Sequence, residues 1–170
     1  LISTMIASFV LKECHSDAAT KALGDVASGV PMTLAVTNKL GSWEPGDTDV
    51  AAAGTTLNGT AYFVQDAQKC DQFIVSATTP KGVALFLVDA NAAGVSITPD
   101  GIIDLTRDQA HVEFKNVEAI ELAAPGTGEE SLASALPAIQ TIITADMVGA
   151  GEWLLQTTVD YSTTRVQFDR

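Results

Sequence analysis

The sequence predicts an α+β protein in which short antiparallel strands form a β-barrel or sandwich, flanked by short N-terminal helices and one long C-terminal helix. Residues 62–64 and 73–75 are runs of strand-forming side chains separated by a polar connector. Turn-forming residues recur about every ten residues through the middle of the chain, which is typical of an antiparallel sheet. After Pro137, apolar residues recur instead at spacings of three and four, as in a helix.

Two short helices are expected at the N-terminus. Residues 1–12 form an apolar helical run, which is too short to cross a bilayer because a spanning helix needs about 20 residues. Ser16 fits the N-cap of a second helix that runs to about Ala27 and closes at Ser28 and Gly29. We predict no transmembrane span. Because the chain starts on Leu rather than Met, we expect it to be an excerpt of a longer protein.

Short strands and turns are expected in the middle of the chain. Asn58 and Gly59 both tolerate positive φ, so this pair predicts a tight turn. Residues 38–49 are rich in Gly, Pro and Asp and predict a long loop. The expected strands are residues 32–37, 50–53, 56–57, 62–64, 73–75, 83–88, 94–98, 110–114 and 117–122.

A long helix is expected at the C-terminal end. Thr127, followed three residues later by Glu130, is a capping-box pattern. Residues 137–168 then form one helix of about 45 Å at 1.5 Å per residue. Its apolar residues lie on more than one face, so we expect neighbours on several sides, supplied by further chain or by another subunit. The main stripe is Ile139, Ile143, Met147, Ala150 and Leu154, and Ile142, Val148, Trp153 and Leu155 lie off it.

Composition bears on the partners to expect. Acidic residues number 21 against 9 basic ones, giving a formal net charge of −12 without a basic cluster to neutralise phosphates. Nucleic acid and an anionic membrane surface are therefore not expected partners, and acidity of this size is typical of a solubility device. Cys14 and Cys70 lack metal-ligand spacing and are interpreted as structural thiols in a reducing, cytoplasmic setting. His15 and His111 are single histidines and are interpreted as structural, so no metal site is expected.

Six segments resemble those of a known family. In order and at about the right spacing, they resemble the acyl-CoA dehydrogenase family, from the end of its N-terminal helical domain, through its middle β-domain, into the first helix of its C-terminal domain. The resemblance covers roughly residues 16–170 and implies domains at 1–30, 31–122 and 123–170. The six segments are residues 27–29, 34–37, 58–60, 81–88 with 94–95, 112–117, and 161–168.

The resemblance implies an FAD-dependent acyl-CoA dehydrogenase, an oxidoreductase of fatty acid or lipid metabolism that desaturates the Cα–Cβ bond of an acyl-CoA thioester. In that chemistry a carboxylate takes the α proton while hydride passes from the β carbon to N5 of the flavin. The implied partners are the acyl-CoA substrate, further subunits in a homo- or hetero-tetramer, and an electron-accepting flavoprotein.

The resemblance assigns two polar flavin contacts to one loop. The family carries a Leu-Thr-Glu-Pro-Gly-x-Gly-Ser type motif after the first strand of the β-domain, and residues 36–38 and 41–42 match parts of it. Thr37 and Ser42 are then the flavin-ring and nearby polar contacts. Residues 44–46 imitate the motif but lie too close to the following hairpin. From the residues alone, Thr37 is a strand-end hydroxyl and Ser42 a loop serine.

Two further pairs complete the implied cofactor site. A Trp-Ile-Thr type triplet of the family corresponds to residues 63–65, so Phe63 packs on the flavin and Gln65 offers its amide in place of the threonine hydroxyl. Arg165 and Gln167 match an Arg-x-Thr/Gln-Phe motif whose side chains reach the FAD diphosphate of a neighbouring subunit, a task that suits a guanidinium. From the residues alone, Arg165 is a helix-end arginine in solvent.

No catalytic residue is expected in this sequence. In most family members the glutamate base lies downstream of the arginine motif, beyond Arg170, and in a minority it takes the place of Ile139, which cannot accept a proton. The alternative to the dehydrogenase is a non-catalytic, flavin-deficient subunit or stand-alone β-domain of the same family, which Asn38 and Gln65 favour. A small all-β carbohydrate- or ligand-binding module is a third interpretation, and the long apolar helix argues against it.

Overall fold

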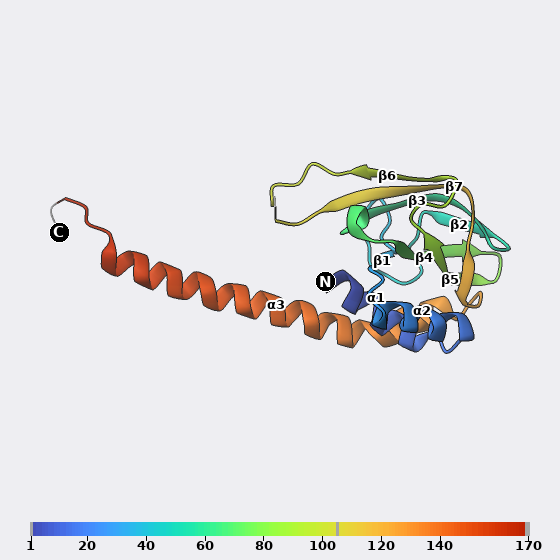
Figure 1. The fold of residues 1–170 in the computed structure, drawn as a ribbon, viewed down its shortest axis with the longest axis horizontal. Helices are drawn as coiled ribbons and strands as arrows, with labels where there is room; N and C mark the ends of the chain where they lie inside the picture. The colour runs from blue at the N-terminus through green and yellow to red at the C-terminus, as the bar shows by residue number, and fades with distance from the viewer. Residues whose placement is uncertain (1, 105, 169–170) are drawn as a thin grey trace.

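The computed structural model describes residues 2–104 and 106–168. Two helices, α1 (Ile2–Glu13) and α2 (Asp17–Ala27), precede the strands, and α3 (Gly128–Thr164) follows them. In Figure 1 the strands form two layers above α1 and α2, and α3 projects far beyond them. The strands are β1 (Met32–Ala35), β2 (Val50–Ala53), β3 (Thr56–Gln65), β4 (Gln72–Thr79), β5 (Gly82–Asp89), β6 (Val95–Pro99), β7 (Gln109–Glu118) and β8 (Ile120–Ala123), with a 3-10 turn η1 (Ala67–Lys69) between β3 and β4.

One mixed sheet contains all eight strands; seven follow the order β6-β7-β3-β2-β4-β5-β8, and β1 pairs with β4 off this path. β1 and β2 lie one after the other along the same edge of β4 and are parallel to it, with Leu34 paired to Ile74 and Ala51 to Thr78. Within the described residues β6 and β8 end this order and do not pair, so the sheet stays open. The predicted α+β class is confirmed. The prediction of a closed barrel is wrong, because β1 and β2 pair in parallel with β4 and no antiparallel pair joins the end strands β6 and β8 among the described residues.

Two apolar cores lie on opposite faces of β4 and β5. Phe73 and Phe86 point into the first core, where these strands face β3 and β7. Ile74 and Leu85 point into the second core, which α1, α2 and the first turns of α3 cover. Because both faces are covered, β4 and β5 are nearly continuous apolar runs rather than alternating ones.

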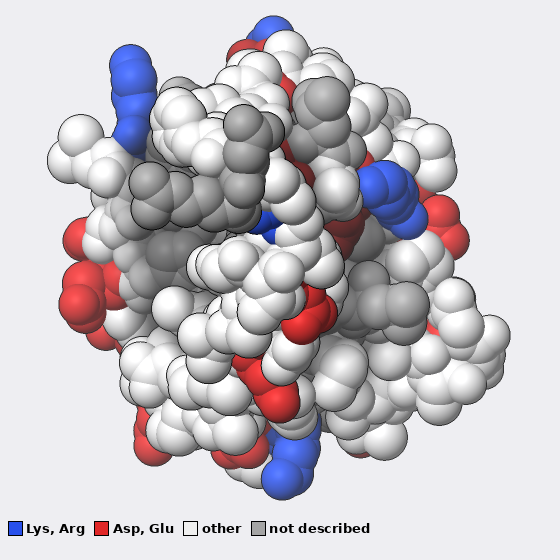
Figure 2. Space-filling view, turned by 90° about the vertical axis from the view of Figure 1, so that its left-hand side faces the viewer, with Lys and Arg blue, Asp and Glu red and all other residues white. Residues whose placement is uncertain are grey.

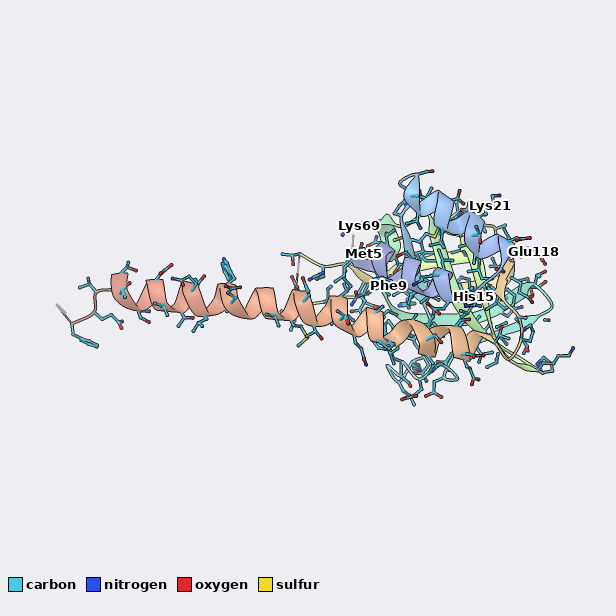
Figure 3. All side chains as sticks on the ribbon, turned by 90° about the horizontal axis from the view of Figure 1, so that it is seen from below. Met5, Phe9, His15, Lys21, Lys69 and Glu118 are labelled. Carbon is cyan, nitrogen blue, oxygen red and sulfur yellow. The ribbon has the colours of Figure 1, made fainter. Side chains whose placement is uncertain are left out.

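The N-terminal helices are confirmed close to their predicted bounds. Ser16 caps α2, since its Oγ accepts the N–H of Ala19 at 3.1 Å, and it also donates to the carbonyl of Leu122 at 2.7 Å, which ties the helix to β8. Figure 3 shows α1, with Met5 and Phe9, beside the first turns of α3. Both helices thus belong to the base on which the sheet rests.

The predicted turn at Asn58 and Gly59 is wrong. Both residues lie inside β3, and the chain reverses at Gly54 instead. Gly59 has φ +133, and a Cβ there would lie 2.2 Å from the carbonyl oxygen of Asp49, so glycine is needed for close strand approach. The Asn58 side chain accepts the N–H of Asn116, which forms a bulge in β7.

The long helix is confirmed, but it begins nine residues before Pro137 and ends at Thr164. The Thr127 hydroxyl donates to the carbonyl of Ala124 rather than capping the helix, so the predicted capping box is wrong. Pro137 is exposed, and so is Ala133, whose carbonyl loses its helical partner there. Water can satisfy that carbonyl, which is why the proline does not break the helix.

Beyond Asp146, which lies 3.0 Å from Arg107, the described residues of α3 are all exposed. The buried residues of α3 end at Ile139, and the rest of the helix projects away from the sheet in Figure 1. Of the helices that the structure describes, only α3 is long and apolar enough to cross a membrane by length and composition. Core helices of soluble proteins satisfy the same criterion.

Candidate functional site

The loop after β1 and the end of β3 lie side by side. The N–H of Tyr62 donates to the carbonyl of Thr37 at 2.9 Å, and the Thr33 hydroxyl donates to the carbonyl of Gln65 at 2.8 Å. Two segments separated by more than twenty residues therefore form one rim of the sheet. Thr37 and the 63–65 segment, which sequence reasoning assigned to one site, are brought together.

A β-bulge in β3 sets the direction of Phe63. Ala61 pairs with Val112 and Val64 with Ala110, so Tyr62 and Phe63 together face the single residue His111. Phe63 has φ +54, a conformation that costs about 1–3 kcal/mol for a residue with a side chain. Its ring is 45% exposed although it belongs to a strand over an apolar core. The bulge thus turns an aromatic face outward at the rim.

The loop that follows Thr37 is stabilised by its own polar side chains. The Asn38 carboxamide oxygen accepts the N–H groups of Leu40 and Ser42, each at 3.0 Å. The Ser42 hydroxyl donates to Asp47 at 2.7 Å and accepts the N–H of Glu44 at 3.2 Å. Ser42, a predicted contact residue, therefore already uses its hydrogen atom inside the loop.

Two other polar side chains of the rim have no hydrogen-bond partner among the described residues, although Thr37 is only 6% exposed. Within residues 2–104 and 106–168, no hydrogen bond engages the Thr37 hydroxyl or the Gln65 side-chain amide. Gln65 is exposed, two residues after Phe63 in β3. An exposed aromatic face next to two unused polar groups fits the edge of a flat ring system that carries heteroatoms.

An apolar pocket that sequence reasoning missed lies beside this rim, between the loop and the start of α3. Trp43 covers it from the loop side and is 47% exposed. Ile139, the residue at the place of a possible base, lies on its floor and is buried. The pocket is lined by Val36, Trp43, Glu44, Pro45, Leu132, Leu136 and Ile139.

A second cavity, of about 250 Å³, opens on the other side of Gln65. Arg107 stands at its mouth, and its Nη2 lies 3.0 Å from the carboxylate of Asp146 on α3. Gln65 therefore belongs to the lining of this cavity as well as to the end of β3. The cavity is lined by Gln65, Asp66, Ile102, Asp104, Arg107, Asp108 and Gln109.

Arg165 is the C-cap residue of α3, and Gln167 follows it, at the end of the helix that lies far from the sheet in Figure 1. The Arg165 guanidinium lies 5.1 Å from the ring centroid of Tyr161, one turn earlier, and donates to its hydroxyl. A single copy of the chain does not bring these two predicted residues to Thr37, Phe63 and Gln65. Any shared site would require a second copy or another chain.

Comparison with known proteins gives a consistent result. No model of a known protein family matches the chain. The acyl-CoA dehydrogenase FadE27 of Mycobacterium tuberculosis is 36% identical over 132 residues, which cover 75% of this chain and 35% of that protein. A glutaryl-CoA dehydrogenase of Mycobacterium smegmatis in complex with FADH2 superposes with a TM-score of 0.80 at 22% identity, covering 96% of this chain and 45% of that one. A glutaryl-CoA dehydrogenase in complex with glutaryl-CoA gives 0.86 at 18% identity, covering 99% and 47%.

The chain belongs to the acyl-CoA dehydrogenase family. It spans less than half the length of each of these three proteins. The two structural matches show that the sheet, the N-terminal helices and the direction of α3 are those of the acyl-CoA dehydrogenase fold.

The two thiols of the chain are unsuited to nucleophilic chemistry at neutral pH. Burial raises the pKa of the Cys70 thiol to about 11, and the nearby Asp66 carboxylate adds to the shift. Burial also raises the pKa of Cys14 to about 11. Both cysteines are free, and no group of three potential metal ligands occurs among the described residues.

On the face seen in Figure 2, Lys and Arg side chains are scattered singly among acidic ones.

The bulge at Phe63 is the site feature that sequence reasoning did not find. In the sequence, residues 62–64 are an ordinary strand-forming run with no glycine to mark a positive φ. The pairing that reveals the bulge comes from β7, nearly fifty residues later, so no local signal was present. His111 likewise has no partner motif nearby in the sequence, yet its ring stacks on Tyr62.

Proposed function

We propose that this chain is the flavin-holding middle of an FAD-dependent acyl-CoA dehydrogenase, in which Thr37, Phe63 and Gln65 contact one edge of the isoalloxazine ring. The hydrogen bond from Tyr62 to Thr37 carries the proposal, because it joins the two motif-bearing segments into one rim. The FADH2 complex of the glutaryl-CoA dehydrogenase, which shares this fold, supports the choice of cofactor.

Each rim residue has a role that its chemistry allows. Phe63 offers a half-exposed ring face for packing against the flavin. The Thr37 hydroxyl and the Gln65 carboxamide can donate hydrogen bonds to ring oxygen and nitrogen atoms. Ser42 contributes as an acceptor near the ring, since its own hydrogen atom is held by Asp47. FAD, when bound, supplies the hydride acceptor that the protein itself lacks.

The distal end of α3 serves a neighbouring subunit in this proposal. Arg165 and Gln167 reach the diphosphate of the neighbour's FAD, which explains why they lie so far from their own rim. Arginine suits a diphosphate because its paired N–H donors match two phosphate oxygens. The apolar faces of α3 then pack in the helical part of the oligomer, with residues 1–30, 31–122 and 123–170 belonging to three successive domains.

We further propose that the substrate is an acyl-CoA thioester and that the electrons pass to a second flavoprotein. A cytoplasmic location is also part of the proposal. The base comes from outside residues 1–170, because Ile139 occupies the position of the early-helix glutamate. The described residues contribute orientation of the flavin and exclusion of water rather than proton transfer.

A flavin-deficient subunit of the same family is the second candidate. Two observations favour it. Asn38 uses its side chain to close the loop on itself, and Gln65 projects further than a threonine would from the same position. A longer side chain at the flavin edge would keep the ring from approaching Phe63. The two candidates differ in one measurable property, the retention of FAD by the chain's own rim.

The deciding experiment is purification of the full-length protein, alone and with candidate partner subunits, followed by visible absorption spectroscopy. Oxidised-flavin bands together with acyl-CoA-dependent bleaching are expected for the dehydrogenase. Phe63→Ala should lose these bands, whereas Ile120→Ala, at an exposed apolar residue of β8, is the control and should keep them. A colourless protein that stays inactive with acyl-CoA and added FAD, with every partner tried, would contradict the dehydrogenase.

A further inference from the structure

His111 lies directly across from the bulge that displays Phe63. The β7 register leaves it opposite Tyr62 and Phe63, which have no other residue of that strand to pair with. Ala110 and Val112 on either side point into the first core. His111 therefore points to the same outer face of the sheet as the bulge.

Aromatic contacts connect His111 to Phe63. The imidazole stacks on the Tyr62 ring, with 6.2 Å between centroids and 30° between planes. Tyr62 in turn lies 6.4 Å from the Phe63 ring at 47°. Aromatic pairs at such separations contribute about 0.5–1.5 kcal/mol beyond the area they bury. Displacement of the imidazole would remove the support on one side of Tyr62.

Asp100 holds the imidazole in place. Its Oδ1 lies 3.1 Å from His111 Nδ1, and its backbone N–H donates to the carbonyl of Gln109 at 2.8 Å. The backbone of His111 is paired with Thr98 of β6. Both side chains of the pair are mostly covered, with 38% of the histidine and 26% of the aspartate side chain exposed. The imidazole is thus fixed through its backbone and through a ring nitrogen.

This arrangement accounts for a conformation that local sequence would not maintain. Phe63 has φ +54 without being glycine, and such strained residues persist only where their surroundings determine them strongly. On one side the Tyr62 N–H is bonded to Thr37, and on the other its ring is stacked on His111. Tyr62 is therefore held by the loop after β1 through its backbone and by β7 through its ring.

We propose that His111 and Asp100 are positioning residues of the cofactor site, which fix the Tyr62 ring and through it the direction of the Phe63 ring that packs on the flavin. The inference rests on the proposed function. Neither residue of the pair touches the flavin, and both act only through Tyr62.

FAD titration of the full-length apoprotein tests the proposal, with flavin fluorescence and the visible spectrum as readouts. His111→Ala is expected to weaken FAD binding by about three- to tenfold, the range for loss of one aromatic pair. It is also expected to reduce the vibrational structure of the visible absorption bands of the flavin. His111→Phe keeps a flat ring against Tyr62 and should recover most of the affinity. Asp100→Ala should give an intermediate loss. Glu113→Gln, on the same strand and the same outer face, is the control and should bind like wild type.

A double-mutant cycle separates positioning from a general effect on folding. In a Phe63→Leu background, which keeps an apolar contact and measurable FAD binding, His111→Ala should cause no further loss, because the ring through which it acts is gone. Equal losses in both backgrounds would assign His111 a purely structural role and overturn the proposal. So would wild-type affinity and spectrum in His111→Ala or, where that variant does not fold, in Asp100→Ala.

The outcome for the proposed function can be distinguished in the same titration. Loss of FAD in Phe63→Ala with no change in His111→Ala would reject the positioning pair and leave the proposed function standing. A wild-type protein that binds no FAD, or a Phe63→Ala variant that binds it normally, would overturn both.

Discussion

The sheet with its covering helices and the free part of α3 use apolar residues in opposite ways. In the sheet, Phe73 and Phe86 are fully buried, and β4 is covered on both faces. In α3 beyond Ile139, Trp153 is 66% exposed and Leu155 67%. Apolar side chains therefore stabilise the fold in the sheet, whereas those on α3 beyond Ile139 stay exposed to solvent and are free to bind a partner.

This difference shows where the described chain is self-sufficient. The two cores need nothing beyond residues 2–139 to be filled, because three layers enclose them. The free part of α3 carries apolar side chains around much of its circumference, a pattern that requires several neighbours. The two cores account for the stability of the fold, and the exposed part of α3 is suited to assembly with other subunits.

The largest expected effect comes from truncating an aromatic ring in the sheet. Phe86→Ala leaves a cavity in the first core and should lower the free energy of unfolding by about 3–5 kcal/mol. Trp153→Ala removes a larger ring from α3 but should change the free energy of unfolding by no more than about 0.5 kcal/mol. Urea denaturation of the 170-residue chain under monomeric conditions measures both. Similar losses in the two variants would erase the distinction between the regions.

Self-association of the 170-residue chain is the next largest effect. The exposed apolar face of α3 should drive it to dimers or larger species, since contiguous patches of this kind mark interaction sites. Leu154→Lys combined with Leu155→Glu should return it to a monomer without changing the unfolding of the sheet. Sedimentation velocity reads out both results. A clean monomer of the unaltered chain would show that α3 needs no partner.

Arg165→Ala should produce a smaller change that concerns the assembled protein only. Among residues 2–104 and 106–168 the far end of α3 is exposed, so the free energy of unfolding should stay the same. FAD retention in the oligomer should fall by about tenfold, the loss expected for one charge-assisted pair of hydrogen bonds. Equilibrium dialysis measures the retained flavin, with Lys115→Ala as a surface control. Unchanged flavin content would mean that Arg165 has no cofactor role.

Local patterns predicted much of the fold. The Ser16 cap, the alternation in β7 and the period of α3 each reflect interactions within a few residues, and all three are present in the structure. The open sheet was missed because β1 and β2 join β4 through long-range parallel pairing, which leaves no local signal. The prediction of a turn at Asn58 and Gly59 was wrong for a related reason. Gly59 lies within β3, where the absence of a Cβ lets the backbone of Asp49 and Val50 approach closely.

The candidate site was predicted only in part. Motif order placed Thr37 beside residues 63–65, and the Tyr62 hydrogen bond joins those two segments. Cofactor contacts by these residues, and by Ser42, Arg165 and Gln167, stay predictions. The bulge at Phe63 and its contact with His111 depend on the register of β7, which is set by the packed sheet as a whole.

The smallest expected effect concerns the one ion pair that joins the two regions among the described residues. Arg107 and Asp146 lie 3.0 Å apart, but both side chains are about half exposed, at 53% and 54%. An exposed pair of this kind contributes about 0.2–1 kcal/mol and weakens further in salt, so Arg107→Ala should cost no more than that. A double-mutant cycle with Asp146→Ala, followed by urea denaturation at low and high salt, isolates the pairwise contribution. A coupling energy well above this range would mean that the pair, rather than the buried start of α3, sets the angle at which the helix leaves the sheet.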